Sequence, residues 1–135
     1  MTSEVRLRMP ARAEYLLLGR LALAGLARTV PLDPELLADL KLAVTEACAN
    51  AVRHAYEEEG SMTLLFSIDE RIVRIDVEDE GGGFEAQQVE EWEPNAVSED
   101  GMGLAIIRAV VDDLSVDGRA DSSGTVVRLR KRLSA

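Results

Sequence analysis

The apolar positions of this chain change their spacing several times, and each change marks a predicted element. Val5, Leu7 and Met9 alternate with charged residues. This alternation predicts a first strand, which Pro10 ends. A helical stretch over about 11–28 follows, so rich in leucine that more than one of its faces is apolar. Such a helix is either deeply buried or buried on one side and packed against a second subunit on the other.

Three residues indicate where a second helix begins. Asp33 can cap the helix, Pro34 fits the first helical position, and Glu35 places an acid in the first turn. Apolar residues continue at helical spacing beyond this point, so we expect a long helix that ends near Glu58.

The remaining chain predicts a hairpin, a long loop, one more helix and two more strands. Two stretches rich in β-branched residues are close enough in sequence to pair antiparallel, and glycine and proline then break the pattern. The expected ranges are 62–69 and 72–79 for the hairpin, 80–100 for the loop, 103–114 for the helix, and from 116 and at 125–133 for the last strands. This order predicts an α+β fold, a two-layer α/β sandwich in which helices cover one face of a mostly antiparallel sheet.

Composition limits the classes of function. The length of 135 residues suits one domain, so residues 1–135 are expected to form a single unit. No apolar run approaches the roughly 20 residues of a membrane span, and the first residues lack the layout of a signal peptide, so a soluble, cytoplasmic protein is expected. One cysteine and one histidine exclude an internal disulfide and a zinc cluster. A net charge of −10 argues against direct nucleic-acid binding.

A polar stripe interrupts the apolar second helix. Glu46, Asn50 and His54 recur every four residues, and each such step drifts only about 40° around a helix axis. All three side chains should therefore project from one face. Taken alone, a stripe of this kind usually faces solvent, but two glycine-rich segments further along the chain favour a binding site.

Those two segments have the properties of a nucleotide pocket. Asp79 ends a predicted buried strand, where its carboxylate could accept a hydrogen bond from an exocyclic amine such as that of adenine. Gly81 and Gly83 follow, and glycine allows the close backbone approach that a bound nucleotide requires. Gly101 and Gly103 precede a predicted helix, whose first N–H groups suit phosphate oxygens.

Phosphates bring magnesium, which prefers oxygen ligands and usually takes only one or two from the protein. The side-chain carbonyl of Asn50 fits this role. Glu46, one turn away, could accept a proton from a hydroxyl or water that attacks the γ-phosphate. His54, one turn in the other direction, could donate to phosphate.

These segments resemble the nucleotide-binding boxes of the GHKL superfamily of ATPases and kinases. ExxxNxxxH over 46–54 is similar to the N box, DxGxGF over 79–84 to the first glycine box, and GxGL over 101–104 to the second. The resemblance implies a Bergerat-type ATP-binding fold that takes ATP and Mg²⁺, with Asn50 on the metal and a Gly124-Thr125 pair near the adenine. The nucleotide-binding residues expected from these boxes are Asn50, His54, Asp79, Gly81, Gly83, Gly101, Met102, Gly103, Leu104 and Thr125.

Within that superfamily, residues 39–56 resemble the anti-sigma factor serine kinases of the RsbW and SpoIIAB type. The resemblance implies that Glu46 is the general base toward a serine of an anti-anti-sigma protein of the STAS class. It also implies a homodimer that binds a sigma factor. One departure concerns the loop over 85–100, which would be the ATP lid, because it contains no Lys or Arg to meet the γ-phosphate.

Three other functions compete with the serine kinase as interpretations of this sequence. A non-catalytic ATP-binding anti-sigma module is favoured by the acidic lid. A stand-alone GHKL ATPase would use Glu46 to activate water. The catalytic domain of a histidine kinase would need a phosphoacceptor histidine on a preceding helix, and the single histidine, His54, lies inside the N box.

Overall fold

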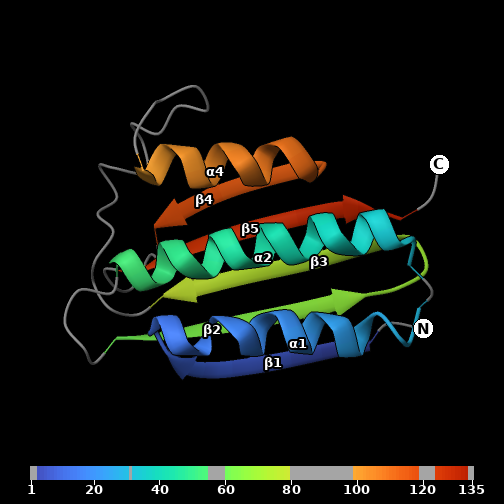
Figure 1. The fold of residues 1–135 in the computed structure, drawn as a ribbon, viewed down its shortest axis with the longest axis horizontal. Coiled ribbons are helices and arrows are strands. Elements are labelled where there is room, and N and C mark those ends of the chain that lie inside the picture. Colours follow the sequence, from blue (N-terminus) through green and yellow to red (C-terminus); the bar gives the residue numbers. More distant parts are fainter. Residues whose placement is uncertain (1–2, 31, 55–59, 80–98, 119–123, 134–135) are drawn as a thin grey trace.

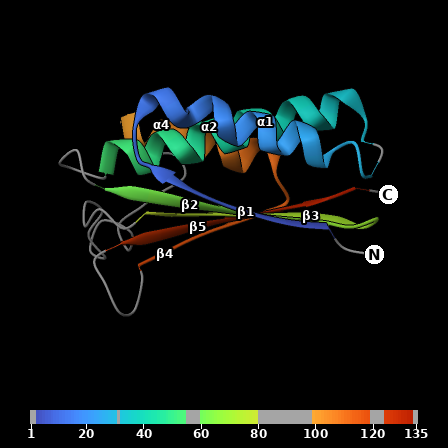
Figure 2. The same ribbon diagram turned by 90° about the horizontal axis from the view of Figure 1, so that it is seen from below.

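The computed structural model describes residues 3–30, 32–54, 60–79, 99–118 and 124–133 of the chain. These residues form two layers, a five-stranded sheet and helices that cover one of its faces (Figures 1 and 2). The strands are β1 (Ser3–Pro10), β2 (Ser61–Ile68), β3 (Ile72–Asp79), β4 (Asp113–Gly118) and β5 (Thr125–Arg132). The helices are the 3₁₀ turn η1 (Ala13–Tyr15), α1 (Leu16–Leu26), α2 (Pro34–His54) and α4 (Glu99–Val110). The predicted α+β sandwich is confirmed.

The sheet is antiparallel at every described pairing, with the strand order β1-β2-β3-β5-β4. Strand β5 therefore inserts between β3 and β4, although it follows both in sequence. The register pairs Asp79 with Met62 on one side and with Thr125 on the other. These pairings place the last residue of β3 and the first residue of β5 side by side at one end of the sheet.

The core lies between the sheet and the helices. Alternate strand residues face the helices because successive side chains of a strand point to opposite faces. Phe66, Ile75 and Leu129 are opposite one another on β2, β3 and β5, and all three are at most 1% exposed. Helix α2 lies between α1 and α4 over the middle of the sheet (Figure 1). Its buried residues Val44, Ala47 and Cys48 complete this core.

The opposite sheet face is polar, and its basic residues pair with acids on neighbouring strands. Arg130 contacts Asp76 at 3.0 Å, and Arg128 contacts Asp117 at 2.7 Å. Arg128 and Arg130 of β5 thus form cross-strand ion pairs on a partly solvated surface. Within the described ranges, no helix combines the length and apolarity that a membrane span needs.

The boundaries of the first and the last predicted helix need correction. The first helix consists of η1 followed by α1, because the chain passes through a 3₁₀ turn before Leu16. The predicted last turn of α2, up to Glu58, lies outside the described residues. Helix α4 begins at Glu99, four residues before the predicted start, and ends at Val110. Gly101 and Gly103 are therefore inside its first turns and do not precede it.

The predicted extension of that helix to Leu114 is wrong, because Leu114 belongs to β4, opposite Leu129. Strand β4 correspondingly begins at Asp113, three residues before the predicted strand at Val116. Apolar residues at 107, 110, 111 and 114 match helical spacing, but Leu114 and Val116 also alternate as strand residues do. The sheet decides between the two patterns, because its edge beside β5 provides backbone hydrogen-bond partners for a strand.

Candidate functional site

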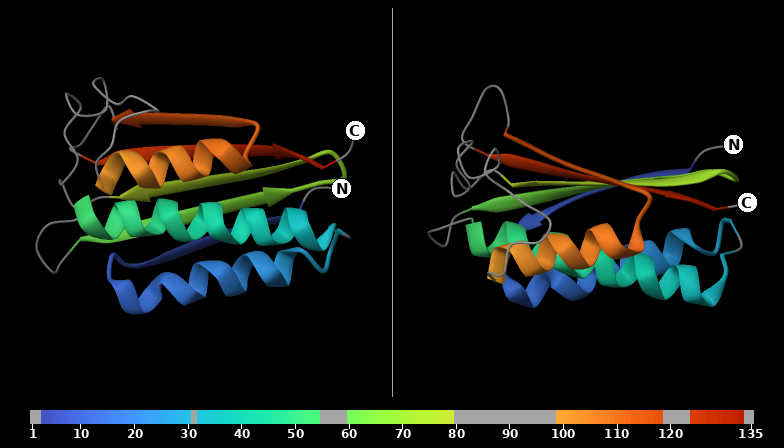
Figure 3. Two further views of the ribbon diagram at one scale, coloured as in Figure 1. Left: turned by 45° about the horizontal axis from the view of Figure 1, so that its top comes forward. Right: turned by 90° about the horizontal axis from the view of Figure 1, so that it is seen from above.

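A pocket lies between α2, α4 and the strands β3, β4 and β5, and Figure 3 shows how these elements are arranged. It encloses about 280 Å³ of space, part of which is open to solvent. Its lining comes from five elements: Ala47, Asn50 and Ala51 of α2, Val77 and Asp79 of β3, Leu104 of α4, Val116 of β4, and Thr125 and Val127 of β5. Pockets for small ligands combine such apolar walls with a few placed polar groups.

The polar groups of the pocket are unusually well buried. Asn50, Thr63, Asp79 and Thr125 are the buried polar side chains in the described part of the chain, and three of these four line the pocket. Asp79 and Thr125 are cross-strand partners, each at most 4% exposed. Both residues have further interactions, but the buried Oδ1 atom of Asp79 accepts no hydrogen bond from any described residue. A donor on a bound base fits this atom.

A second polar cluster lies where α2 meets the start of α4. The Nη2 atom of Arg53 donates a hydrogen bond of 2.8 Å to Oδ1 of Asn50. Glu46 belongs to the same face of α2, one turn before Asn50. A carboxylate, an amide oxygen and a guanidinium group thus meet beside the pocket.

Gly103 allows α4 to approach this cluster. A Cβ atom at Gly103 would lie 3.2 Å from Oε1 of Glu46, 3.3 Å from Nη2 of Arg53 and 3.7 Å from Oδ1 of Asn50. The first two distances are tight enough that the neighbouring groups would have to move. The absent side chain therefore lets the polar face of α2 pack directly against α4.

The sequence matches the model of a known family. The pattern of the histidine kinase-like ATPase domain matches residues 9–131. The chain belongs to this family. The serine-protein kinase RsbW of Listeria innocua is 36% identical over 126 residues, an alignment that covers 86% of this chain and 80% of that protein. RsbW of Bacillus subtilis is 33% identical over 140 residues, covering 96% and 86%.

Solved structures of other histidine kinase-like ATPase domains share the fold. The structure of the RsbU and RsbW domains of Rv1364c from Mycobacterium tuberculosis superposes with a TM-score of 0.69 and 22% identity, covering 98% of this chain and 33% of that chain. The catalytic domain of the histidine kinase ThkA superposes with a TM-score of 0.62 and 15% identity, covering 100% and 99%. At these identities the structures support the fold alone.

The structure locates some of the predicted site residues of this ATPase domain, and others lie outside the described residues. The structure brings Glu46, Asn50, Asp79, Gly103 and Thr125 to one end of the sandwich, and Leu104 lines the pocket with 2% of its surface exposed. His54, Gly101 and Met102 lie on α2 and α4 at the same end, but their side chains are outside the described set. Gly81, Gly83 and the lid over 85–98 are outside the described residues.

The sequence interpretation missed Arg53. It followed the helix in steps of four from Glu46, whereas Arg53 lies three residues after Asn50 and seven after Glu46. Steps of three and of seven also return to the same helix face. That spacing was available in the sequence and places a cation beside the metal-binding candidate.

The site of this family member suits magnesium in one respect that the structure shows. Oε1 of Glu46 and Oδ1 of Asn50 both lie next to Gly103, so two oxygen atoms of the kind that Mg²⁺ prefers are close together. In the described residues, no group of three His, Cys, Asp or Glu side chains could hold a metal. Asn50 with one more oxygen donor is compatible with an ion that takes most of its ligands from water and phosphate.

Proposed function

We propose that this chain is an ATP-dependent serine protein kinase and anti-sigma factor that phosphorylates a serine of a STAS-class anti-anti-sigma protein. The observation that carries this proposal is the pocket lined by the buried Asn50, Asp79 and Thr125, together with the Glu46 carboxylate that lies near Asn50 beside Gly103. Relatives named serine-protein kinase RsbW, similar over most of the chain, support the same activity.

The inner end of the pocket would bind the adenine base. The carboxylate of Asp79 can accept a hydrogen bond from the exocyclic amine, and the hydroxyl of Thr125 can donate or accept beside it. Val77, Val116 and Val127 provide apolar surface for the faces of the base. This half of the site supplies affinity for the nucleotide and does not take part in transfer.

The outer end would carry the chemistry. Asn50 would hold Mg²⁺ through Oδ1, and the bound ion would neutralise phosphate charge. Glu46 would accept the proton of the serine hydroxyl as its oxygen attacks the γ-phosphate. Arg53 would contribute a positive charge next to the phosphates, a role that the lid over 85–100 has no Lys or Arg to fill.

Labelled ATP, Mg²⁺ and a candidate STAS protein test the role of Glu46. Glu46→Gln keeps the size of the side chain but removes its basicity, so we expect unchanged ATP affinity and phosphotransfer that falls about 100-fold or more. Calorimetry measures the affinity, and the appearance of phosphoserine measures the transfer. Unchanged transfer in the variant would remove Glu46 from the mechanism.

The acidic lid favours a second candidate function, an ATP-binding anti-sigma module without kinase activity. The two candidates differ in one result. Binding of a sigma factor together with transfer to the STAS protein supports the kinase, and sigma binding without transfer supports the module. We further propose that the protein acts in the cytoplasm as a homodimer, and the exposed leucines of α1 support its self-association.

A further inference from the structure

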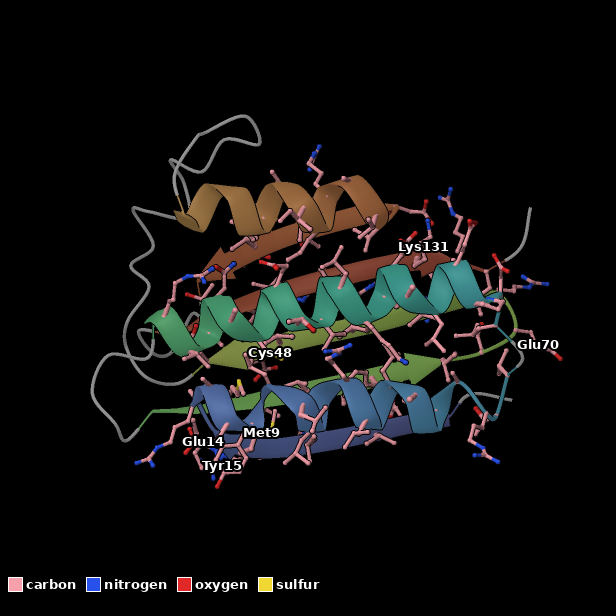
Figure 4. The ribbon with its side chains drawn as sticks, in the orientation of Figure 1. Met9, Glu14, Tyr15, Cys48, Glu70 and Lys131 are labelled. Carbon is pink, nitrogen blue, oxygen red and sulfur yellow. The ribbon has the colours of Figure 1, made fainter. Side chains whose placement is uncertain are left out.

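Asn50 and Arg53 share the face of α2 that turns away from α1. Cys48, on the same helix, marks the opposite face, because a Cβ added at Gly19 of α1 would lie 3.6 Å from its Sγ atom. Figure 4 shows Cys48 between α2 and α1. Successive helix residues turn by about 100°, so Asn50 and Arg53 lie roughly 160° and 140° around the helix from Cys48. Both side chains therefore face α4, the helix on the other side of α2.

The hydrogen bond between these two side chains involves the oxygen atom that the proposed function assigns to Mg²⁺. Nη2 of Arg53 donates to Oδ1 of Asn50 at 2.8 Å. A metal ion at Asn50 would use lone pairs of the same oxygen, and a guanidinium group at this distance would repel the ion. Arg53 in its present position and a metal ion at Asn50 therefore compete for one atom.

Arg53 lies at the rim of the site, where its charged end can change partners. Asn50 lines the pocket and is 4% exposed, whereas Arg53 is exposed and is not among the described residues of the pocket lining. The long aliphatic stem of an arginine lets its charged end shift while the helix stays in place. Exchange of the Asn50 contact for another one thus requires no movement of α2.

A bound phosphate is the alternative partner of Arg53. A Cβ at Gly103 would lie 3.3 Å from Nη2, so the guanidinium group packs against the first turns of α4. The first N–H groups of a helix suit phosphate oxygens. Phosphate is also a charged acceptor, and it binds a guanidinium group more strongly than the neutral amide oxygen of Asn50 does. Nucleotide phosphates at the start of α4 would therefore draw Arg53 away from Asn50.

We propose that Arg53 makes the metal site depend on bound nucleotide. Arg53 holds Oδ1 of Asn50 and disfavours a metal ion there, until phosphate oxygens take over its guanidinium group and release Oδ1. This inference rests on the proposed function and adds an order to it, because the metal ion then binds with the nucleotide and not before it. Linkage makes the effect reciprocal, so a metal ion at Asn50 would in turn favour the contact between Arg53 and phosphate.

Mn²⁺ alone tests the first half of this exchange, because it prefers the same oxygen ligands as Mg²⁺ and its free form is measured by electron paramagnetic resonance. Arg53→Met keeps the aliphatic stem and removes the competing donor. Without nucleotide, this variant should bind Mn²⁺ at least about tenfold more tightly than the native chain, because the ion no longer displaces a hydrogen bond to a charged group. The 25 acidic residues can hold Mn²⁺ elsewhere, so only the binding that Asn50→Ala abolishes is counted.

ADP tests the second half. When phosphates hold Arg53, the native chain should bind Mn²⁺ within about threefold of the Arg53→Met variant. Mn²⁺ held by free ADP is measured in samples without protein and subtracted. A general effect of the lost charge would persist in the ADP complex, since the guanidinium group stays near the ion in both states. Arg74→Met, which removes a charge from the open, polar face of the sheet, should match the native chain with and without ADP.

Two results would overturn the role of Arg53. One is equal Mn²⁺ affinity of the native chain and Arg53→Met without ADP, and the other is the same gain from the substitution with and without ADP. Calorimetry of ADP binding to the native chain tests the proposed function by itself. A native chain that binds no ADP would refute that function, whereas ADP binding without linkage to Mn²⁺ would refute only the exchange at Asn50.

Discussion

At the scale of single residues, Arg53 changes what the site can do. The lid over 85–100 has no basic residue, and a kinase needs positive charge near the transferred phosphoryl group. Arg53 supplies a guanidinium group 2.8 Å from Oδ1 of Asn50. Its planar array of donors suits phosphate oxygens. Arg53 thus offers, from α2, a positive charge that the sequence over 85–100 does not contain.

Replacement of Arg53 gives the first prediction. Arg53→Met keeps the aliphatic part of the side chain and removes its charge, so affinity for ATP should fall about tenfold to a hundredfold. Affinity for adenosine should be unchanged, because the base would bind at Asp79. Calorimetry with both ligands measures the difference. Arg74→Met, which removes the same charge from the open sheet face, should bind both as the native chain does.

Equal losses for ATP and adenosine would show that Arg53 only supports the fold. Arg53→Lys separates charge from geometry. It should recover part of the ATP affinity, because lysine keeps the charge without the planar fork.

Cys48 gives a prediction about pH. Burial raises the pKa of its thiol from 9.0 to about 12. The unfolded chain therefore ionises first as pH rises, and the folded state loses stability above pH 9. From this group the unfolding free energy should fall by about 1.4 kcal/mol per pH unit between the two pKa values.

The Cys48→Ala variant removes the contribution of this thiol to the pH dependence of the unfolding free energy. Its unfolding free energy should decline less steeply than that of the native chain above pH 9, measured by urea denaturation at a series of pH values. Parallel pH profiles for the two proteins would contradict the assignment. The native thiol should also resist alkylation until the chain unfolds.

At the scale of elements, two glycines of α1 have opposite surroundings. A Cβ at Gly19 would lie 2.9 Å from Cδ2 of Leu64 and 3.3 Å from Cγ1 of Val44, whereas a Cβ at Gly25 would meet nothing within 4 Å. Gly19 thus sets how closely α1 packs on α2 and β2. Gly25 has no such constraint inside the described chain.

Alanine at these positions should therefore have opposite effects. Gly19→Ala should destabilise the protein by about 1–3 kcal/mol, because the core must move apart. Gly25→Ala should stabilise it by about 0.4–1 kcal/mol, because alanine restricts the unfolded chain. Chemical denaturation of both variants at low protein concentration measures the change. Equal effects would show that α1 is not packed as the structure has it.

The elements that could be predicted from the sequence are those with one dominant spacing. The hairpin over 62–79 and the last strand are rich in β-branched and apolar residues that largely alternate in burial, and a sheet that buries one face accepts only one register of such a pattern. The boundary between α4 and β4 could not be predicted, because Leu114 fits both spacings and β5 decides between them. Local pattern carries no information about a partner strand that comes later in the chain.

The site was predictable to the extent that its residues lie on one element. Glu46 and Asn50 share a face of α2 by spacing alone, and Asp79 ends an evident strand. The contact between Gly103 and the polar face of α2 depends on how α4 packs, which no local pattern contains. The apolar pocket wall around Val77 and Val127 likewise exists only once β5 lies beside β3.

At the scale of the whole molecule, nucleotide binding should stabilise the entire fold. The pocket lining comes from α2, α4, β3, β4 and β5, so a ligand there binds the folded chain alone. ADP with Mg²⁺ at about 100 times its dissociation constant should add about 2.7 kcal/mol, seen as an increase of several degrees in the melting temperature. Asp79→Asn should lose most of this increase, and its melting temperature without nucleotide provides the baseline.

The insertion of β5 between β3 and β4 has a consequence for how the protein is made. The ribosome synthesises β3, α4 and β4 before β5, the strand that joins β3 to β4. The nascent chain therefore cannot complete its sheet until β5 has emerged. Thr125, the neighbour of Asp79, is also among the residues synthesised late. A message truncated before this segment would yield a product that neither closes its sheet nor holds an adenine, and cellular proteases would be expected to remove it.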